Sequence, residues 1–107
     1  MTHGSKIQLS ERERDTVTRI LARFEGKIGP VKVYGSRATG RARLNSDLDL
    51  VIYPPFSTKN YARLADAFET SDLPIKVDMV GWASIDSQGL RREIERHSVD
   101  FPLSSCT

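Results

Sequence analysis

The chain has 107 residues, of which 38% are hydrophobic and 28% charged, and its formal net charge is +2. This composition is typical of a folded globular protein and excludes a disordered tail, while the small net charge argues against a dedicated nucleic-acid binder. The longest apolar run, residues 48–53, is too short to cross a bilayer. We expect a single domain over residues 1–107, and the lone cysteine, Cys106, fits the reducing cytoplasm.

A helix is the first element that the sequence predicts. Ser10 stands three residues before Glu13, which is the spacing of a capping box, and glycines at 26 and 29 end the helical pattern. Apolar residues recur at helical spacing and should face a core, whereas arginines occupy the other side. The two groups are Val17, Ile20, Leu21 and Phe24 on the apolar side, and Arg12, Arg19 and Arg23 on the polar side.

Two strands with a short connection follow. Residues 31–34 are predicted as a strand that ends at Gly35, and residues 36–42 as a short helix or helical turn. Residues 47–53 form the second strand, whose alternation places two sets of side chains on opposite faces. One face carries Leu48, Leu50 and Ile52, and the other carries Asp47, Asp49 and Val51.

The second half of the chain repeats this alternation of helix and strand. Ser57 or Thr58 caps a helix with an apolar stripe at 61, 64, 65 and 68, and residues 75–80 form a third strand. A last helix begins after Asp86, and residues 99–101 add a possible edge strand. His97 falls on the apolar stripe of this last helix, so we interpret it as a packed or capping histidine.

The fold class that follows is α+β, similar to α/β, with a small mixed sheet flanked by helices in the order α-β-α-β-α-β-α. If Gly35 at the end of the first strand meets Asp47 at the start of the second, these strands run antiparallel. The helical crossover that follows suits a third strand parallel to the second, which brings Asp78 near the Asp47/Asp49 face.

The aspartates are the first candidate site. Asp47 and Asp49 lie two residues apart on one strand face, and like charges so placed need a cation or a proton between them. Mg²⁺ suits these oxygen ligands better than zinc does, and Asp78 would complete a site for one or two ions. A solvated sheet face is the structural alternative for each aspartate.

The Gly35-Ser36 turn is the second candidate site. It lacks both the Walker pattern and G-x-G-x-x-G, but a basic block follows it, so the turn and the arginines could hold a triphosphate opposite the metal. Arg37 is the preferred cation because it lies nearest the turn, although a solvated basic loop explains each arginine equally well. The block consists of Lys32, Arg37, Arg41 and Arg43.

The spacing of these motifs resembles the signature of the DNA polymerase β-like nucleotidyltransferase superfamily, in which Gly-Ser is followed by ten residues and then Asp-x-Asp. The short chain resembles the minimal (MNT) branch of that superfamily. The resemblance, from about residue 31 to residue 80, implies Mg²⁺, ATP as substrate and release of pyrophosphate. It implies that Gly35 and Ser36 hold phosphate and that Asp47, Asp49 and Asp78 are the catalytic and metal-binding carboxylates. Thr39 departs from the arginine that many members carry, and Arg41 could supply that contact.

The same resemblance implies an antitoxin that adenylylates a tyrosine of a HEPN-type ribonuclease toxin, with which it would form a hetero-oligomer. Two alternatives stay open at this point. A binding module would neutralise the toxin by covering it, with no need for catalysis. A small-molecule nucleotidyltransferase is less favoured, because this length leaves no second domain to enclose an acceptor.

Overall fold

The structure is a computed structural model that describes residues 7–101, so Cys106 lies outside the described residues. Helix α1 spans Glu11–Ala22, and its N-terminus is a capping box, as predicted. The Ser10 hydroxyl accepts a hydrogen bond from the Glu13 backbone, and the Glu13 carboxylate accepts one from the Ser10 backbone at 2.9 Å. The helix ends before the predicted glycines, although Phe24 beyond it is still buried.

Four strands form one mixed sheet in the order β3-β2-β1-β4. Strand β1 (Val31–Tyr34) pairs antiparallel with β2 (Leu48–Ile52) on one side and with the short edge strand β4 (Val99–Phe101) on the other. Strand β3 (Val77–Gly81) pairs parallel with β2. The predicted strand directions are therefore confirmed, and β4 completes the sheet.

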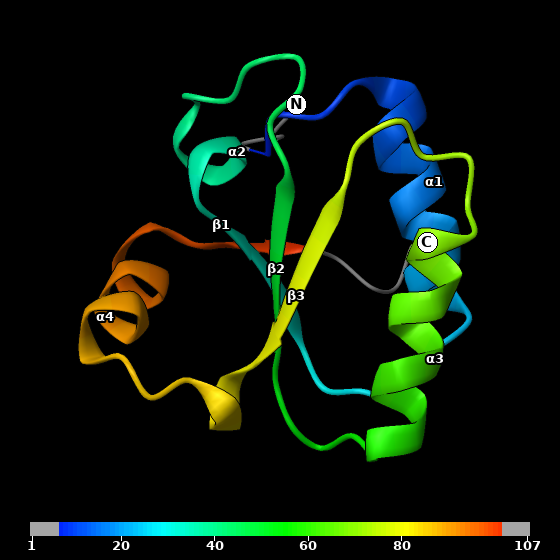
Figure 1. Ribbon diagram of the computed structural model, residues 1–107, viewed down its shortest axis with the longest axis vertical. Helices are drawn as coiled ribbons and strands as arrows, with labels where there is room; N and C mark the ends of the chain where they lie inside the picture. Colours follow the sequence, from blue (N-terminus) through cyan, green and yellow to red (C-terminus); the bar gives the residue numbers. More distant parts are fainter. Residues whose placement is uncertain (1–6, 102–107) are drawn as a thin grey trace.

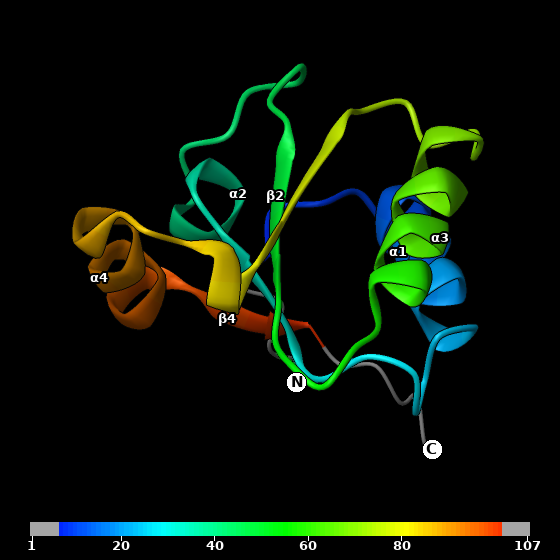
Figure 2. The ribbon, with the colours of Figure 1, turned by 60° about the horizontal axis from the view of Figure 1, so that its bottom comes forward.

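The helices lie on both sides of this sheet (Figures 1 and 2). Helix α1 and helix α3 (Thr58–Glu69) lie side by side on one face, whereas α2 (Ser36–Thr39) and α4 (Gln88–His97) lie on the other. A 3₁₀ turn, η1 (Trp82–Ser84), connects β3 to α4. The arrangement is the predicted mixed sheet between helices.

The main core fills the space between the sheet and the α1/α3 pair. Leu48, Leu50 and Ile52 point into it from β2 and are fully buried, as the alternation predicted. Helix α3 starts at its cap Ser57 and contributes Leu64 and Phe68 to the same core. Within residues 7–101, no helix combines the length and the apolar character that crossing a membrane would require.

Candidate active site

The turn after β1 requires glycine at its first position for two reasons. Gly35 has φ +75° and ψ −155°, a backbone conformation that side chains with a Cβ rarely adopt. A Cβ built on Gly35 would also lie only 2.5 Å from Oδ2 of Asp49. The short helix α2 then begins at Ser36 and stops at Gly40, whose φ is +81°. Glycine therefore lets the backbone of the turn approach the carboxylate on the neighbouring strand.

Strand pairing places the aspartates beside this turn. Asp49 is opposite Tyr34 in the antiparallel β1–β2 pair and opposite Asp78 in the parallel β2–β3 pair. Asp47 lies immediately before β2, on the loop side of the same strand end. Asp47 and Asp49 are half-buried and Asp78 is exposed. The structure thus places Asp49 beside both Gly35 and Asp78, with Asp47 two residues earlier at the same strand end, while the chemical roles of these residues stay predictions.

The electrostatics of this strand end are unfavourable for a free carboxylate. Burial raises the pKa of Asp49 above its ordinary value, and the neighbouring charges of Asp78 and Asp47 raise it further. Burial also raises the pKa of Tyr34, with additional contributions from Asp49, Asp78 and Tyr61, so its phenol stays protonated at neutral pH. A cation bound here would relieve the repulsion among the carboxylates.

The donor chemistry fits magnesium bound together with a phosphate ligand. Mg²⁺ prefers oxygen ligands and is usually held by one or two carboxylates plus substrate phosphates, not by a complete protein cage. Asp47 and Asp49 offer two such carboxylates, with Asp78 on the next strand. Within the described range 7–101, no group of three or more His, Cys, Asp or Glu side chains is close enough together to hold a metal ion.

The Arg37 side chain is buried against backbone carbonyls, whereas the sequence suggested that it binds phosphate at the turn. Its exposed fraction is 4%, and its guanidinium donates hydrogen bonds to backbone carbonyl oxygens instead of pointing to the open side of the turn. Nε and Nη2 donate to the Ser46 carbonyl at 3.1 and 2.8 Å, and Nη1 donates to the Gln8 carbonyl at 2.7 Å. Arg37 therefore anchors the loop that leads to Asp47, and its guanidinium is engaged by backbone carbonyls instead of facing a nucleotide.

The rest of the basic block is dispersed by the fold. Lys32 lies 3.7 Å from Asp100 and over the ring of Tyr53, toward the other end of the sheet. Arg43 is exposed, and its carbonyl accepts a hydrogen bond from Ser46. Arg41 alone in this block lines a pocket with Gly35 and Ser36. The contiguous positive patch expected from the sequence is therefore reduced to one arginine at the turn.

Helix α4 contributes two residues to that pocket that sequence reasoning did not place there. His97 and Glu93 line it together with Gly35, Ser36, Thr39 and Arg41. His97 was interpreted as a packed or capping residue, but its side chain is exposed, because the buried position on α4 is Ile94. Helical spacing put His97 on an apolar stripe, and only the approach of α4 to α2 reveals what it faces.

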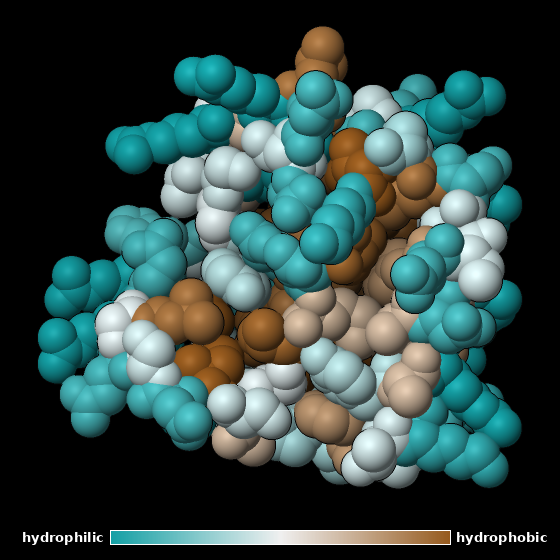
Figure 3. Space-filling model, in the orientation of Figure 1, coloured by the Kyte–Doolittle hydropathy of each residue, from teal (hydrophilic) through white to brown (hydrophobic). Residues whose placement is uncertain are grey.

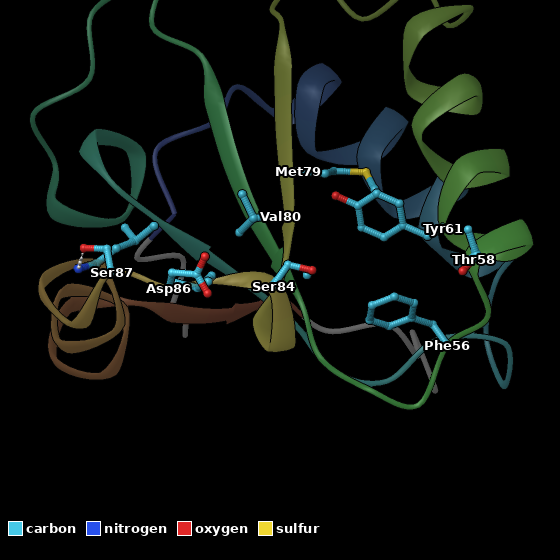
Figure 4. Close-up of a pocket in the computed structure, with 11 residues that line it drawn as sticks. Phe56, Thr58, Tyr61, Met79, Val80, Ser84, Asp86 and Ser87 are labelled. Atoms are coloured by element: carbon cyan, nitrogen blue, oxygen red, sulfur yellow. Dashed lines mark hydrogen bonds between the residues drawn. The ribbon is translucent and has the colours of Figure 1, made fainter.

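A wider apolar pocket of about 560 Å³ lies away from this turn, between the start of α3, the end of β3 and the start of α4 (Figure 4). Phe56 and Tyr61 point toward each other on one side of β3, and Val80 lies on its other side (Figure 4). Figure 3 shows apolar residues gathered at the centre of this face of the molecule. None of the predicted site residues lines this pocket, so it is separate from the carboxylate site.

Comparison with known proteins agrees with this geometry. Residues 15–100 match the family model "Polymerase beta, Nucleotidyltransferase". The chain is 36% identical to the "Probable protein adenylyltransferase MntA" of Haemophilus influenzae over 86 residues, which is 78% of this chain and 75% of that protein. A solved structure described as a "putative minimal nucleotidyltransferase" is 33% identical, with a TM-score of 0.60, and the match covers 82% of this chain and 88% of the other.

Two more distant structures share the fold. One is a toxin–antitoxin with AMP-PNP (TM-score 0.64, 20% identity, 86% of this chain and 74% of that one). The other is a tri-AMPylated Shewanella oneidensis HEPN toxin in complex with its MNT antitoxin (TM-score 0.59, 15% identity, 90% of this chain and 74% of that one). The family match covers most of the chain and includes the turn and all three aspartates. The chain therefore belongs to the polymerase beta nucleotidyltransferase family.

Proposed function

We propose that this protein is a Mg²⁺-dependent adenylyltransferase that transfers AMP from ATP to a tyrosine of a HEPN-type toxin and so acts as its antitoxin. The observation that carries the proposal is the contact of the Gly35 turn with Asp49, whose strand neighbour is Asp78. This contact supports the proposal because a backbone turn that could bind phosphate lies beside carboxylates that could bind a cation. The name of the Haemophilus influenzae relative and the fold shared with MNT antitoxins support the choice of acceptor.

In this proposal each residue has a separate task. Gly35 and Ser36 hold the phosphates through the backbone and the Ser36 hydroxyl. Asp47 and Asp49 would hold Mg²⁺. When bound, the ion would neutralise negative charge on the phosphates. Asp78 accepts the proton of the attacking tyrosine as the phenolic oxygen bonds to the α-phosphorus. The bond from that phosphorus to the bridging oxygen breaks, and pyrophosphate leaves with the displaced electron pair.

The test uses the purified chain, ATP labelled at the α-phosphate, Mg²⁺ and the protein encoded by the neighbouring gene, which the proposal expects to be of the HEPN type. The native chain should label the toxin, and Asp47→Asn or Asp49→Asn should lower the labelling rate by more than about 100-fold, because transition-state charge is no longer neutralised. Asp66→Asn, a matched change on the exposed side of α3, should label normally. Absence of label with the native chain, or equal label with Asp47→Asn, contradicts the proposal.

The double variant Asp47→Asn/Asp49→Asn separates catalysis from simple covering of the toxin. If catalysis neutralises the toxin, this variant should still bind it in a pull-down but fail to protect cells that express it. Protection that persists in the double variant would instead favour a binding module whose nucleotide site is dispensable.

A further inference from the structure

The pocket between the Gly35 turn and the end of α4 has a volume of about 470 Å³, and five of its six lining residues carry polar or charged side chains. The turn side supplies the hydroxyls of Ser36 and Thr39 and the guanidinium of Arg41, and α4 supplies His97 and Glu93. Gly35 belongs both to this pocket and to the contact with Asp49. The pocket and the carboxylate site therefore adjoin each other at Gly35.

The position of α4 depends on packing and not on the pocket. Ile94 is fully buried with Val51 and Ile85, which fixes the rotation of the helix against the sheet. Residues 93 and 97 lie four positions apart and so share one face of the helix, one turn from each other. Both residues line the pocket opposite α2, and the two helices lie on the same side of the sheet although about half of the chain separates them (Figure 2).

The two sides of Gly35 could bind different phosphates of a polyphosphate, one side through a cation and the other through direct hydrogen bonds. Carboxylates on one side can hold phosphate oxygens only through a cation. On the other side, the Arg41 guanidinium, the His97 imidazole and the Ser36 hydroxyl can donate hydrogen bonds to phosphate oxygens directly, whereas the Thr39 hydroxyl donates to the carbonyl oxygens of the turn itself. Arg37 does not compete for this role, because its guanidinium is bound to the carbonyls of Gln8 and Ser46. Arg41 is thus the arginine available at the turn.

We infer that α4 forms the second wall of a pyrophosphate subsite, in which His97 and Arg41 bind the β- and γ-phosphates of the nucleoside triphosphate and Glu93 weakens their binding. This inference rests on the proposed function, since it takes ATP as the substrate. It assigns nucleotide discrimination to a helix that lies outside the Gly-Ser and Asp-x-Asp motifs. Glu93 is the one acidic residue among the six that line the pocket, and its charge opposes the phosphates.

The test measures equilibrium binding of ATP, ADP and AMP to the native chain and its variants by titration calorimetry with Mg²⁺ present. His97→Ala and Arg41→Ala should each weaken ATP binding about tenfold and leave AMP binding nearly unchanged, because each removes a charge-assisted hydrogen bond to the terminal phosphates. Arg96→Ala is the matched control for a lost cation, since Arg96 is exposed on the same turn of α4 but does not line the pocket. Thermal unfolding curves check that every variant is folded.

Glu93→Gln gives a prediction of opposite sign. If phosphates occupy the pocket, removing this carboxylate should tighten ATP binding severalfold, whereas the exposed control Glu95→Gln should have no effect. Weaker binding of ATP and AMP alike in Glu93→Gln would overturn the inference and place the ribose hydroxyls there instead. An unchanged ratio of ATP to AMP affinity in His97→Ala would also overturn it.

The labelling experiment distinguishes failure of this inference from failure of the proposed function. A native chain that binds ATP and labels the toxin, with His97→Ala and Glu93→Gln unchanged in nucleotide affinity, would overturn the pyrophosphate subsite alone. A native chain that neither binds ATP nor labels the toxin would overturn both.

Discussion

The two faces of the sheet are built differently, although the same strands supply both. On the α1/α3 face, Leu48, Leu50 and Ile52 join a large buried cluster. On the α2/α4 face, the buried cluster within residues 7–101 has three members, Val51, Ile85 and Ile94. Five partly buried residues pack against this small cluster, namely Tyr34, Tyr53, Val80, Trp82 and Leu90. One face therefore stabilises the fold, and the other holds charges that folding alone would not favour.

This difference explains how a small domain can carry a costly site. Burial raises the pKa of Asp49, which means that its ionised form is less stable in the folded protein than in water. The apolar burial on the opposite face supplies the stability that offsets this cost. Neighbouring residues of a single strand, Leu50 and Asp49, thus have opposite effects on the free energy of folding.

Replacement of a core residue on the α1/α3 face should have the largest effect on stability. Leu50 is fully buried, and Leu50→Ala should lower the free energy of unfolding by about 2–5 kcal/mol through lost burial and a cavity. Leu44→Ala is the matched control, because Leu44 is 91% exposed, and it should change stability by less than about 0.5 kcal/mol. Urea denaturation measures both, and equal effects would contradict the contrast between the faces.

Removal of the Arg37 guanidinium should have the next largest effect, on the loop that carries Asp47. Arg37→Gln leaves the carbonyls of Gln8 and Ser46 without their donors, which should cost about 2 kcal/mol. Amide hydrogen exchange in residues 41–47 should become faster, because the loop loses its anchor. Arg43→Gln, at an exposed position, should change neither quantity. If Arg37 served only nucleotide binding, stability and exchange would be the same as in the native chain.

The aromatic contact that holds η1 and α4 on the second face should contribute less. Tyr53 and Trp82 stack with ring centroids 5.1 Å apart, and the Arg91 guanidinium lies 4.6 Å from the Trp82 ring centroid. Trp82→Ala should lower the free energy of unfolding by about 1–2 kcal/mol, through the lost stacking and cation–π contacts. Trp82→Phe keeps a ring and should lose less than half of that. Equal losses in the two variants, measured by thermal unfolding, would show that stacking is not the source.

The smallest effect is a gain in stability when a site carboxylate is removed. Because the folded pKa of Asp49 is raised, the metal-free protein should lose stability as pH rises from the ordinary pKa of aspartate through the raised value. Asp49→Asn lacks this dependence and should unfold at a slightly higher temperature than the native chain at pH 7 with chelator present. Asp66→Asn, which is exposed on α3, serves as control. A lower unfolding temperature for Asp49→Asn would contradict the pKa argument.

Much of the fold could be predicted because its signals are local. The capping box at Ser10, the alternation along β2 and the apolar stripe of α3 each reflect the period of one element, and the structure confirms them. Strand direction was predictable as well, since it followed from bringing Gly35 to the aspartates. Helix ends were less accurate, because α1 stops at Ala22 and not at the later glycines.

The groups that long side chains contact could not be predicted in the same way. Arg37, Arg41 and Arg43 look alike in sequence, but one is buried against carbonyls, one lines the pocket and one is exposed. A guanidinium bonds equally well to phosphate and to backbone carbonyls, so its partner depends on which groups the fold brings within reach. For Arg37 those groups come from Ser46, nine residues later, and from Gln8, 29 residues earlier in the chain.

The sequence by itself determined the elements and the spacing of a glycine turn and an Asp-x-Asp pair, because backbone conformation and strand alternation are properties of neighbouring residues. The tertiary structure added the exact register that pairs Asp78 with Asp49, and it alone decided that Arg37 supports the loop. It alone decided that His97 of α4 faces the Gly35 turn. These contacts join segments far apart in the chain, so they arise from packing against a shared sheet and not from any local pattern.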